Sequence, residues 1–262
     1  MARYGWRPVF IGLGLVGMLW LPAWLKWMPR ESIPAMSHRD TLPAPTILEI
    51  LRQRSALGAC IAYACQGYLW YLLLTWSPYY LVRARQFSMT DMAKIAGAAY
   101  LASALCATAS GWLSDRWIEV GGSHTLVRKT LTCTGLASAG VFLLLCPLVG
   151  RTGSVVSLLL AFACYGGHIG QTWAMIQTQA GPRASGKWFA IANFFCSIAG
   201  ILAPSVTGFL VNRTESFVWP LVLTAVIAVT GSLCWLFVVG PVKPVAWEEQ
   251  IAVPKDAAAH VA

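Results

Sequence analysis

Long apolar runs that carry almost no charge constrain this chain more than any other feature. The run from Ile95 to Leu113 has 19 residues without a charged side chain, and the pair Asp115 and Arg116 follows it. About 18 or more successive apolar residues are enough to cross the hydrocarbon core of a membrane as a helix. Seven runs are predicted to span: Trp6–Trp27, Leu57–Leu81, Ile95–Leu113, Thr130–Val149, Val155–Met175, Trp188–Val211 and Phe217–Val239.

The composition supports the same interpretation. The chain is 57% hydrophobic and 11% charged, whereas a soluble domain carries roughly 25% charged residues. This surplus of apolar side chains cannot all be buried in a soluble core of 262 residues, so lipid must solvate much of the surface. Membrane β-barrels need alternating segments of about ten residues, which these runs do not resemble. The sequence therefore predicts an all-α membrane protein with about seven transmembrane helices.

The loops between the spans differ in their content of Lys and Arg. Twelve of these residues fall on the side of the 29–54, 114–129 and 176–187 loops and the C-terminal tail, and seven fall on the other side. Because basic loops favour the cytoplasm, the N-terminus is predicted outside and the C-terminus inside, in the inner (plasma) membrane. The net charge of +9 suits contact with the anionic lipid bilayer, and the scatter of basic residues over membrane loops disfavours nucleic acid as a partner.

One long connection divides the chain. Within it, Thr46 and Glu49 have the spacing of a capping box, and Ile47, Leu48, Ile50 and Leu51 supply an apolar side, which predicts a short interfacial helix. The predicted organisation is a lone transmembrane helix over 1–28, a cytoplasmic linker over 29–54, a six-helix bundle over 55–240 and a cytoplasmic tail over 241–262. A cleaved signal peptide is an alternative for the first span, although no convincing cleavage site follows it.

The sequence contains no motif that is typical of a metal site or of an enzyme active site. All eight cysteines fall inside predicted spans without a CxxC pair, so they are interpreted as small packing residues, and neither metal nor cofactor is expected. No catalytic triad or phosphate-binding glycine loop is present, which argues against an enzyme. Small residues repeat every four positions along 95–113, and Gly166 and Gly170 repeat this spacing, which predicts close helix packing.

Polar and aromatic side chains share helix faces within three of the spans, as three-and-four spacing requires. These candidate binding residues are Tyr63, Gln66 and Trp70 in the second span, Tyr165, His168 and Gln171 in the fifth, and Asn193 and Ser197 in the sixth. The alternative for each is a hydrogen bond between helices. His168 is the one titratable residue deep in a span, where proton coupling competes with a neutral hydrogen-bonding role.

The pair after Ile95–Leu113 has two interpretations. Asp115 could lie in a solvated loop at the membrane surface. Alternatively, its carboxylate could meet the N-terminus of the helix that starts near Lys187, where such a contact contributes about 0.3–1 kcal/mol. A contact of that size could hold two parts of a bundle together in one conformation and release them in another.

Several stretches resemble one family of carriers. The sequence GWLSDRW with VRK after it resembles the cytoplasmic signature loop of the major facilitator superfamily, through Gly111, Asp115, Arg116, Arg128 and Lys129. Residues 184–214 look like helix 11 of its anion:cation symporter branch, especially the hexuronate and galactonate carriers. Residues 4–31 and 72–92 are similar to helix 6 and to the end of helix 7.

This resemblance implies function and site residues. It implies the C-terminal part of a transporter of organic anions such as sugar acids, working by proton-coupled symport, with Gln66 near a cavity-facing position and Asn193 at another. It also implies that helices 1 to 5, which carry the main charged site residues of this branch, have no counterpart here. This chain alone is therefore not expected to transport: it is either a truncated product or one that needs a separate N-terminal half-transporter chain. The alternative is a non-transporting membrane sensor or a regulatory partner of a full-length carrier.

Overall fold

The computed structural model describes residue 5 and residues 7–28 and 44–247, and these residues fall into two compact units, Met1–Leu42 and Pro43–Ala262. The first unit contains the helices α1 (Arg7–Met18) and α2 (Trp20–Trp27), which follow one another in a single apolar segment. The predicted linker is described only from residue 44 onward, so most of it lies outside the described residues.

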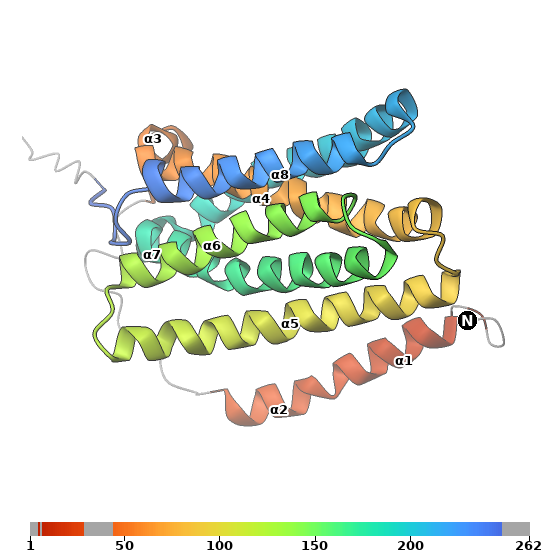
Figure 1. Ribbon diagram of the computed structural model, residues 1–262. Helices are drawn as coiled ribbons and strands as arrows, with labels where there is room; N and C mark the ends of the chain where they lie inside the picture. Colours follow the sequence, from red (N-terminus) through yellow and green to blue (C-terminus); the bar gives the residue numbers. More distant parts are fainter. Residues whose placement is uncertain (1–4, 6, 29–43, 248–262) are drawn as a thin grey trace, which may run out of the picture. The chain divides into compact units, whose positions relative to one another are not determined.

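The second unit is a bundle of helices (Figure 1). Its elements are α3 (Ile47–Arg52), α4 (Arg54–Tyr79), the π-helical turn η1 (Tyr80–Ala84), α5 (Met89–Glu119), α6 (His124–Leu145), α7 (Arg151–Thr214), α8 (Val218–Leu233) and the π-helical turn η2 (Cys234–Val238). No strand occurs among the described residues, which confirms the predicted all-α fold class.

The helix α7 is the centre of this bundle and packs against α4, α5 and α6. It runs for 64 residues, but Gly181 has φ +68° and ψ 176°, so the helix breaks there into two parts of roughly 45–50 Å each. Pro182 follows and lacks the backbone N–H that would continue the helix. The predicted 176–187 loop is therefore helical apart from this break, and α7 supplies two of the seven predicted spans.

By length and composition, five helical segments of the described chain could cross a membrane: Arg7–Trp27, Arg54–Ala84, Met89–Glu119, Arg151–Thr214 and Val218–Val238. The helix α6 is less apolar because Arg128, Lys129 and several threonines occupy its first half. It nevertheless packs between α7 and α8. With α7 counted as two, these helices match the seven predicted spans, and most extend beyond the predicted ends.

The predicted short helix before the bundle is confirmed as α3. Thr46 accepts a hydrogen bond from the Glu49 amide at 3.3 Å, and the Glu49 carboxylate accepts one from the Thr46 amide at 2.7 Å. This is the complete capping box. Of its apolar residues, Ile50 is fully buried, whereas Ile47 and Leu48 are each 59% exposed, so α3 rests on the bundle through one side only.

Small residues bring α5 and the first part of α7 close together. A Cβ added to Gly166 would lie 2.0 Å from the Ser103 carbonyl oxygen, which shows that the two backbones are in direct contact. Gly170 has open space at the same position, so only part of the predicted small-residue stripe forms the contact.

The first residues of the predicted tail fold back and cover the break in α7. The Val245 amide donates to the Gln179 carbonyl at 2.8 Å, and Trp247 Nε1 donates to the Ala180 carbonyl at 2.9 Å. Gln179 Nε2 in turn donates to the Pro241 carbonyl at 3.0 Å. Trp247 also packs edge to face on Trp188, after the break, with ring centroids 6.1 Å apart. We call residues 239–247 the strap, because they contact both parts of α7.

Candidate functional site

The candidate binding residues separate into a buried set and an exposed pair. Tyr63, Gln66, Tyr165, His168 and Gln171 are each at most 5% exposed. Trp70 is partly buried and packs against the same core. Asn193 and Ser197, on the second part of α7, are exposed on the surface of the described bundle.

The buried set is centred on a contact between α4 and α7. His168 Nε2 lies 3.2 Å from Gln66 Oε1, and Thr172 Oγ1 lies 3.4 Å from the same oxygen. Thr172 was not among the sequence-based candidates, although it follows His168 by one helical turn. We call Gln66, His168 and Thr172 the polar hub.

His168 is fully buried, and within the described part of the chain no Asp or Glu pairs with it. Burying an unpaired charge is costly, so the surroundings favour a neutral imidazole that donates to Gln66 through Nε2. Its Nδ1 has no hydrogen-bond partner among the described residues. The hub therefore couples two helices through neutral polar groups.

An aromatic wall adjoins the hub. The Trp70 ring stacks on Tyr165, with centroids 5.0 Å apart and an interplanar angle of 16°. Tyr100 from α5 and Phe162 from α7 meet Trp70 edge to face at 6.0 and 6.5 Å. The Tyr165 ring then contacts the His168 ring edge to face at 4.8 Å. These contacts join α4, α5 and α7 around one site.

Two further candidates have separate neighbours. Gln171 Nε2 donates to the Ser110 carbonyl of α5 at 3.2 Å, which adds a polar bond to the small-residue contact of α5 with α7. Tyr63 packs edge to face on Phe189, which lies in the second part of α7, with centroids 6.0 Å apart. Neither Ser110 nor Phe189 was expected from spacing, because each comes from another span.

The exposed pair has a different character. Ser197 Oγ donates to the Asn193 carbonyl at 2.9 Å, which satisfies the hydroxyl within its own helix. The Asn193 side-chain amide makes no hydrogen bond within the described bundle. Its neighbours along the helix include the exposed Phe194 and Ile201, so the amide is a polar group on an apolar surface.

The residues of the GWLSDRW motif and its continuation lie along α5 and α6. Asp115 is exposed, because α5 continues to Glu119 and places it on a helical turn instead of in a loop. Arg116 pairs with Glu119 at 3.2 Å, and the described residues give Asp115 no hydrogen bond or ion pair. A Cβ added to Gly111 would meet no atom within 4 Å.

Of the two interpretations of Asp115, the contact with the helix near Lys187 is therefore not present in this structure. Lys187 instead donates to the carbonyl of Pro45 at 3.1 Å, just before α3. The two basic residues after the motif are engaged. Arg128 Nη1 donates to Thr178 Oγ1 at 2.9 Å, and Lys129 Nζ donates to the Leu236 carbonyl at 3.1 Å. They link α6 to α7 and to η2 at the end of the bundle that carries the strap.

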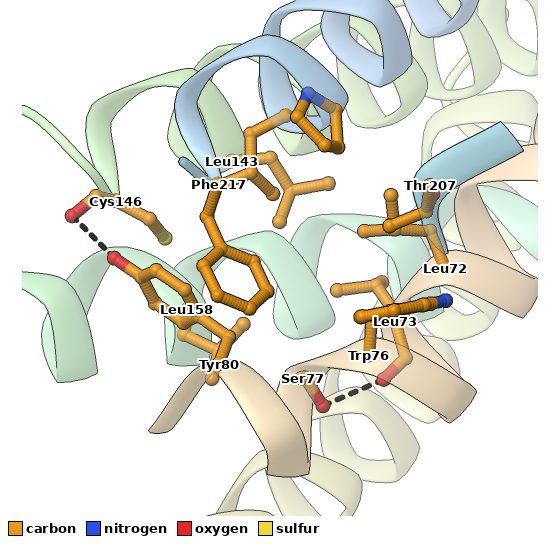
Figure 2. A pocket seen from close by; sticks show the side chains of 12 residues that line it. Leu72, Leu73, Trp76, Ser77, Tyr80, Leu143, Cys146, Leu158, Thr207 and Phe217 are labelled. Atoms are coloured by element: carbon orange, nitrogen blue, oxygen red, sulfur yellow. Dashed lines mark hydrogen bonds between the residues drawn. The ribbon is translucent and has the colours of Figure 1, made fainter. Parts of the chain in front are cut away.

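A small apolar cavity near the other end is not a substrate site. Figure 2 shows its walls, formed by residues such as Leu72, Leu73, Trp76, Leu158 and Phe217. Its volume is about 20 Å³, close to the minimum for one water molecule and far below the roughly 300–1,000 Å³ of ligand pockets.

Metal binding has no support within the described part of the chain. No group of three or more His, Cys, Asp or Glu residues could hold a metal ion there. All eight cysteines are free thiols that are buried or partly buried; seven lie in helices, and Cys146 lies in the turn after α6.

Comparison with known proteins gives a family and relatives. A family model described as Major Facilitator Superfamily matches residues 1–204. The chain is 29% identical to a probable galactarate/D-glucarate transporter of Bacillus subtilis (strain 168), over 94% of this chain and 59% of that protein. It is 28% identical to a hexuronate transporter of the same bacterium, over 94% of this chain and 61% of that protein. It is 30% identical to a probable galactarate/D-glucarate transporter of Escherichia coli (strain K12), over 92% of this chain and 60% of that protein.

The predicted resemblance to sugar-acid carriers is thereby confirmed. The chain spans about 60% of the length of these curated relatives.

Proposed function

Because the chain belongs to the major facilitator superfamily, we propose that it takes part in carrying a small organic anion, such as a sugar acid, across the inner membrane. The relatives are named as transporters of galactarate, D-glucarate and hexuronate. These anions carry carboxylates and several hydroxyls, which need hydrogen-bond donors and acceptors from a site.

The exposed amide of Asn193 is the observation that carries this proposal. An amide left without a partner in hydrocarbon costs several kcal/mol, on the order of 4–8 by transfer to cyclohexane. A surface that bears such a group is therefore expected to face a water-filled cavity or a second bundle instead of lipid. Asn193 lies in a predicted span, where the resemblance expects a cavity-facing residue.

In this proposal the six-helix block moves as one of two bundles around a site between them. Asn193 contacts the anion, while the polar hub and the aromatic wall form its support. The second bundle corresponds to the length of the relatives that this chain does not match, and a separate N-terminal half-transporter chain is one way to supply it. Proton coupling belongs to the same proposal. Because His168 is buried beside neutral groups, the coupling proton is assigned to the second bundle.

Uptake of radiolabelled D-glucarate into proteoliposomes tests the function. The chain is reconstituted alone and together with the first five helices of the Bacillus galactarate/D-glucarate relative. We expect accumulation driven by an inward proton gradient only in the second preparation. Asn193→Ala should reduce that uptake at least tenfold at unchanged protein content, and Ser197→Ala, whose hydroxyl is already satisfied, serves as the matched control.

If Asn193→Ala leaves the uptake unchanged, the Asn193 amide is not part of the binding site. Proton-driven uptake by the chain alone would show that the second bundle is not required. Binding of glucarate without uptake in either preparation would favour a sensor or a regulatory partner of a full-length carrier.

The orientation is proposed from the charge of the loops, with the N-terminus outside and the C-terminus in the cytoplasm. A reporter that is active only in the cytoplasm should work when fused after Ala262 and fail when inserted beside Arg151. The reverse pattern would overturn the orientation.

A further inference from the structure

A second, open hollow lies at the end of the bundle that is opposite to the strap. It is formed where η1 leads into α5, where α6 leads into α7 and where α7 leads into α8. Its volume is about 570 Å³, within the range of small-molecule sites. It is thus large enough for a ligand, unlike the 20 Å³ cavity beneath it, with which it shares Tyr80 and Phe217.

Two arginines give the hollow its charge. Arg83 and Arg85 both line it, and Glu215 is the one acidic residue in the lining, which leaves an excess of positive charge. Arg83 is exposed, and its Nε donates to the Tyr79 hydroxyl at 3.3 Å. The described residues offer no acceptor to its two terminal Nη groups, so they are available to a ligand.

Arg85 is held in place by the protein. Its Nε donates to the Tyr80 hydroxyl at 2.8 Å, and its Nη2 donates to the Cys146 carbonyl. The Tyr80 hydroxyl also donates to the Cys146 carbonyl at 2.8 Å (Figure 2). A guanidinium fixed in this way loses little side-chain freedom on meeting an anion, which lowers the entropic cost of binding. Its Nη1 makes no hydrogen bond with the described residues.

We propose that this hollow is a second binding site, which captures a small carboxylate anion at the mouth of the bundle before it reaches Asn193. The inference rests on the proposed function for the identity of the anion. Arg83 and Arg85 supply guanidinium donors that match a carboxylate. Asn212 lies in the same lining and is exposed, so a thiol at this position can report on the hollow. A positively charged, open hollow concentrates anions, so the site increases the rate at which the anion encounters the transport site at Asn193.

The experiment measures the hollow without transport. Asn212→Cys is introduced into the full chain, purified in micelles and labelled with an anionic sulfonate or a cationic trimethylammonium thiosulfonate reagent. Mass spectrometry of the peptide that contains residue 212 separates this thiol from the eight native ones. We expect the anionic reagent to react faster. Arg83→Gln should lower the anionic-to-cationic rate ratio at least about fivefold, the effect of one unit charge at about 4 Å in water.

Ligand protection identifies the anion class. D-glucarate should slow the labelling at least fivefold, whereas the neutral polyol D-glucitol should not, and Arg83→Gln should abolish this protection. Arg151→Gln is the control, because Arg151 belongs to the same end of the bundle but does not line the hollow. Arg85→Gln should also abolish the protection by D-glucarate. If loss of the Arg85 contacts impairs folding, the exposed Arg83→Gln variant still tests the site.

Absence of glucarate protection, or protection that survives Arg83→Gln, overturns the proposal. Asn193→Ala should leave protection intact while it reduces uptake, so the two sites are distinguished. Protection without uptake in any preparation would retain the hollow and reject the proposed transport. Uptake without protection would retain the proposed transport and reject the hollow as a binding site.

Discussion

Replacing Gly166 by Ala tests whether direct backbone contact holds α5 to α7. The added Cβ would lie 2.0 Å from the Ser103 carbonyl oxygen and 2.6 Å from Ser103 Oγ, whereas ordinary contact begins near 3.4 Å. The two helices must therefore separate by about 1.4 Å at this point. Overpacking of this kind costs about 1–3 kcal/mol. The higher helix propensity of Ala returns at most about 1 kcal/mol. We expect a net loss of about 1–2 kcal/mol.

Gly170→Ala is the matched control, because it lies one turn later in the same helix and meets no atom within 4 Å. It should be neutral or stabilising by up to about 1 kcal/mol. The two variants are compared with wild type by unfolding in dodecyl sulfate from dodecyl maltoside micelles, followed by circular dichroism. A double variant, Gly166→Ala with Ser103→Ala, should stay destabilised because the carbonyl clash remains.

Equal stability of Gly166→Ala and Gly170→Ala would refute the close approach of the helices. Full rescue by Ser103→Ala would show that the hydroxyl, and not the backbone, limits the packing.

Two further predictions concern the ends of the bundle. Thr46→Ala should remove the side-chain acceptor for the Glu49 amide at a cost of about 1 kcal/mol, seen as faster amide exchange in α3, with Thr46→Ser as the control. The hydrogen bonds from the Thr46 amide and hydroxyl lower the pKa of Glu49 below its ordinary value of 4.5. The stabilisation from this cap is therefore fully present above pH 4.5 and is lost as the pH falls through the lower pKa of the folded state. Protection of the α3 amides from exchange should decrease toward about pH 3 and remain constant above about pH 5.5. Arg128→Gln should lower the free energy of unfolding by about 1.5–3 kcal/mol, because it loses charge-assisted bonds to Thr178 and Ala174. Arg116→Gln should change the free energy of unfolding by less than about 1 kcal/mol, because the pair of Arg116 with Glu119 is exposed. A thermal melt in which Arg116→Gln is the more destabilised variant would contradict this assignment.

The features that could be predicted from sequence are those that depend on neighbours in the chain. Hydropathy located the spans because each helix must satisfy its own backbone in lipid. The capping box of Thr46 and Glu49 could be predicted because its partners are three residues apart. Spacing also placed Gln66 and His168 on faces of their own helices, although it could not show that these two faces meet.

The features that were not predicted depend on contacts between distant segments. Gly181 and Pro182 were assigned to a loop, because local sequence does not reveal that helix continues on both sides of the break. The strap contacts residues about 60 positions away. The hollow combines Arg83 and Arg85 with Glu215, more than 100 positions later. Asp115 is exposed, as the solvated-loop alternative expected, but it lies on a helical turn because α5 continues to Glu119.

The division between buried and exposed polar groups has a mechanical consequence. Alternating access requires each bundle to move with little internal change. The polar hub fixes α4 to α7 and Gln171 fixes α7 to α5. The strap ties the first part of α7 to the end of α8 through Gln179 and the second part through the Trp188–Trp247 ring contact. The hydrogen bonds among these links are buried or partly buried, so loss of one partner leaves the other unsatisfied. We therefore propose that these groups keep the block rigid, while Asn193, which no neighbour in the described bundle satisfies, is the group left free for the transported anion.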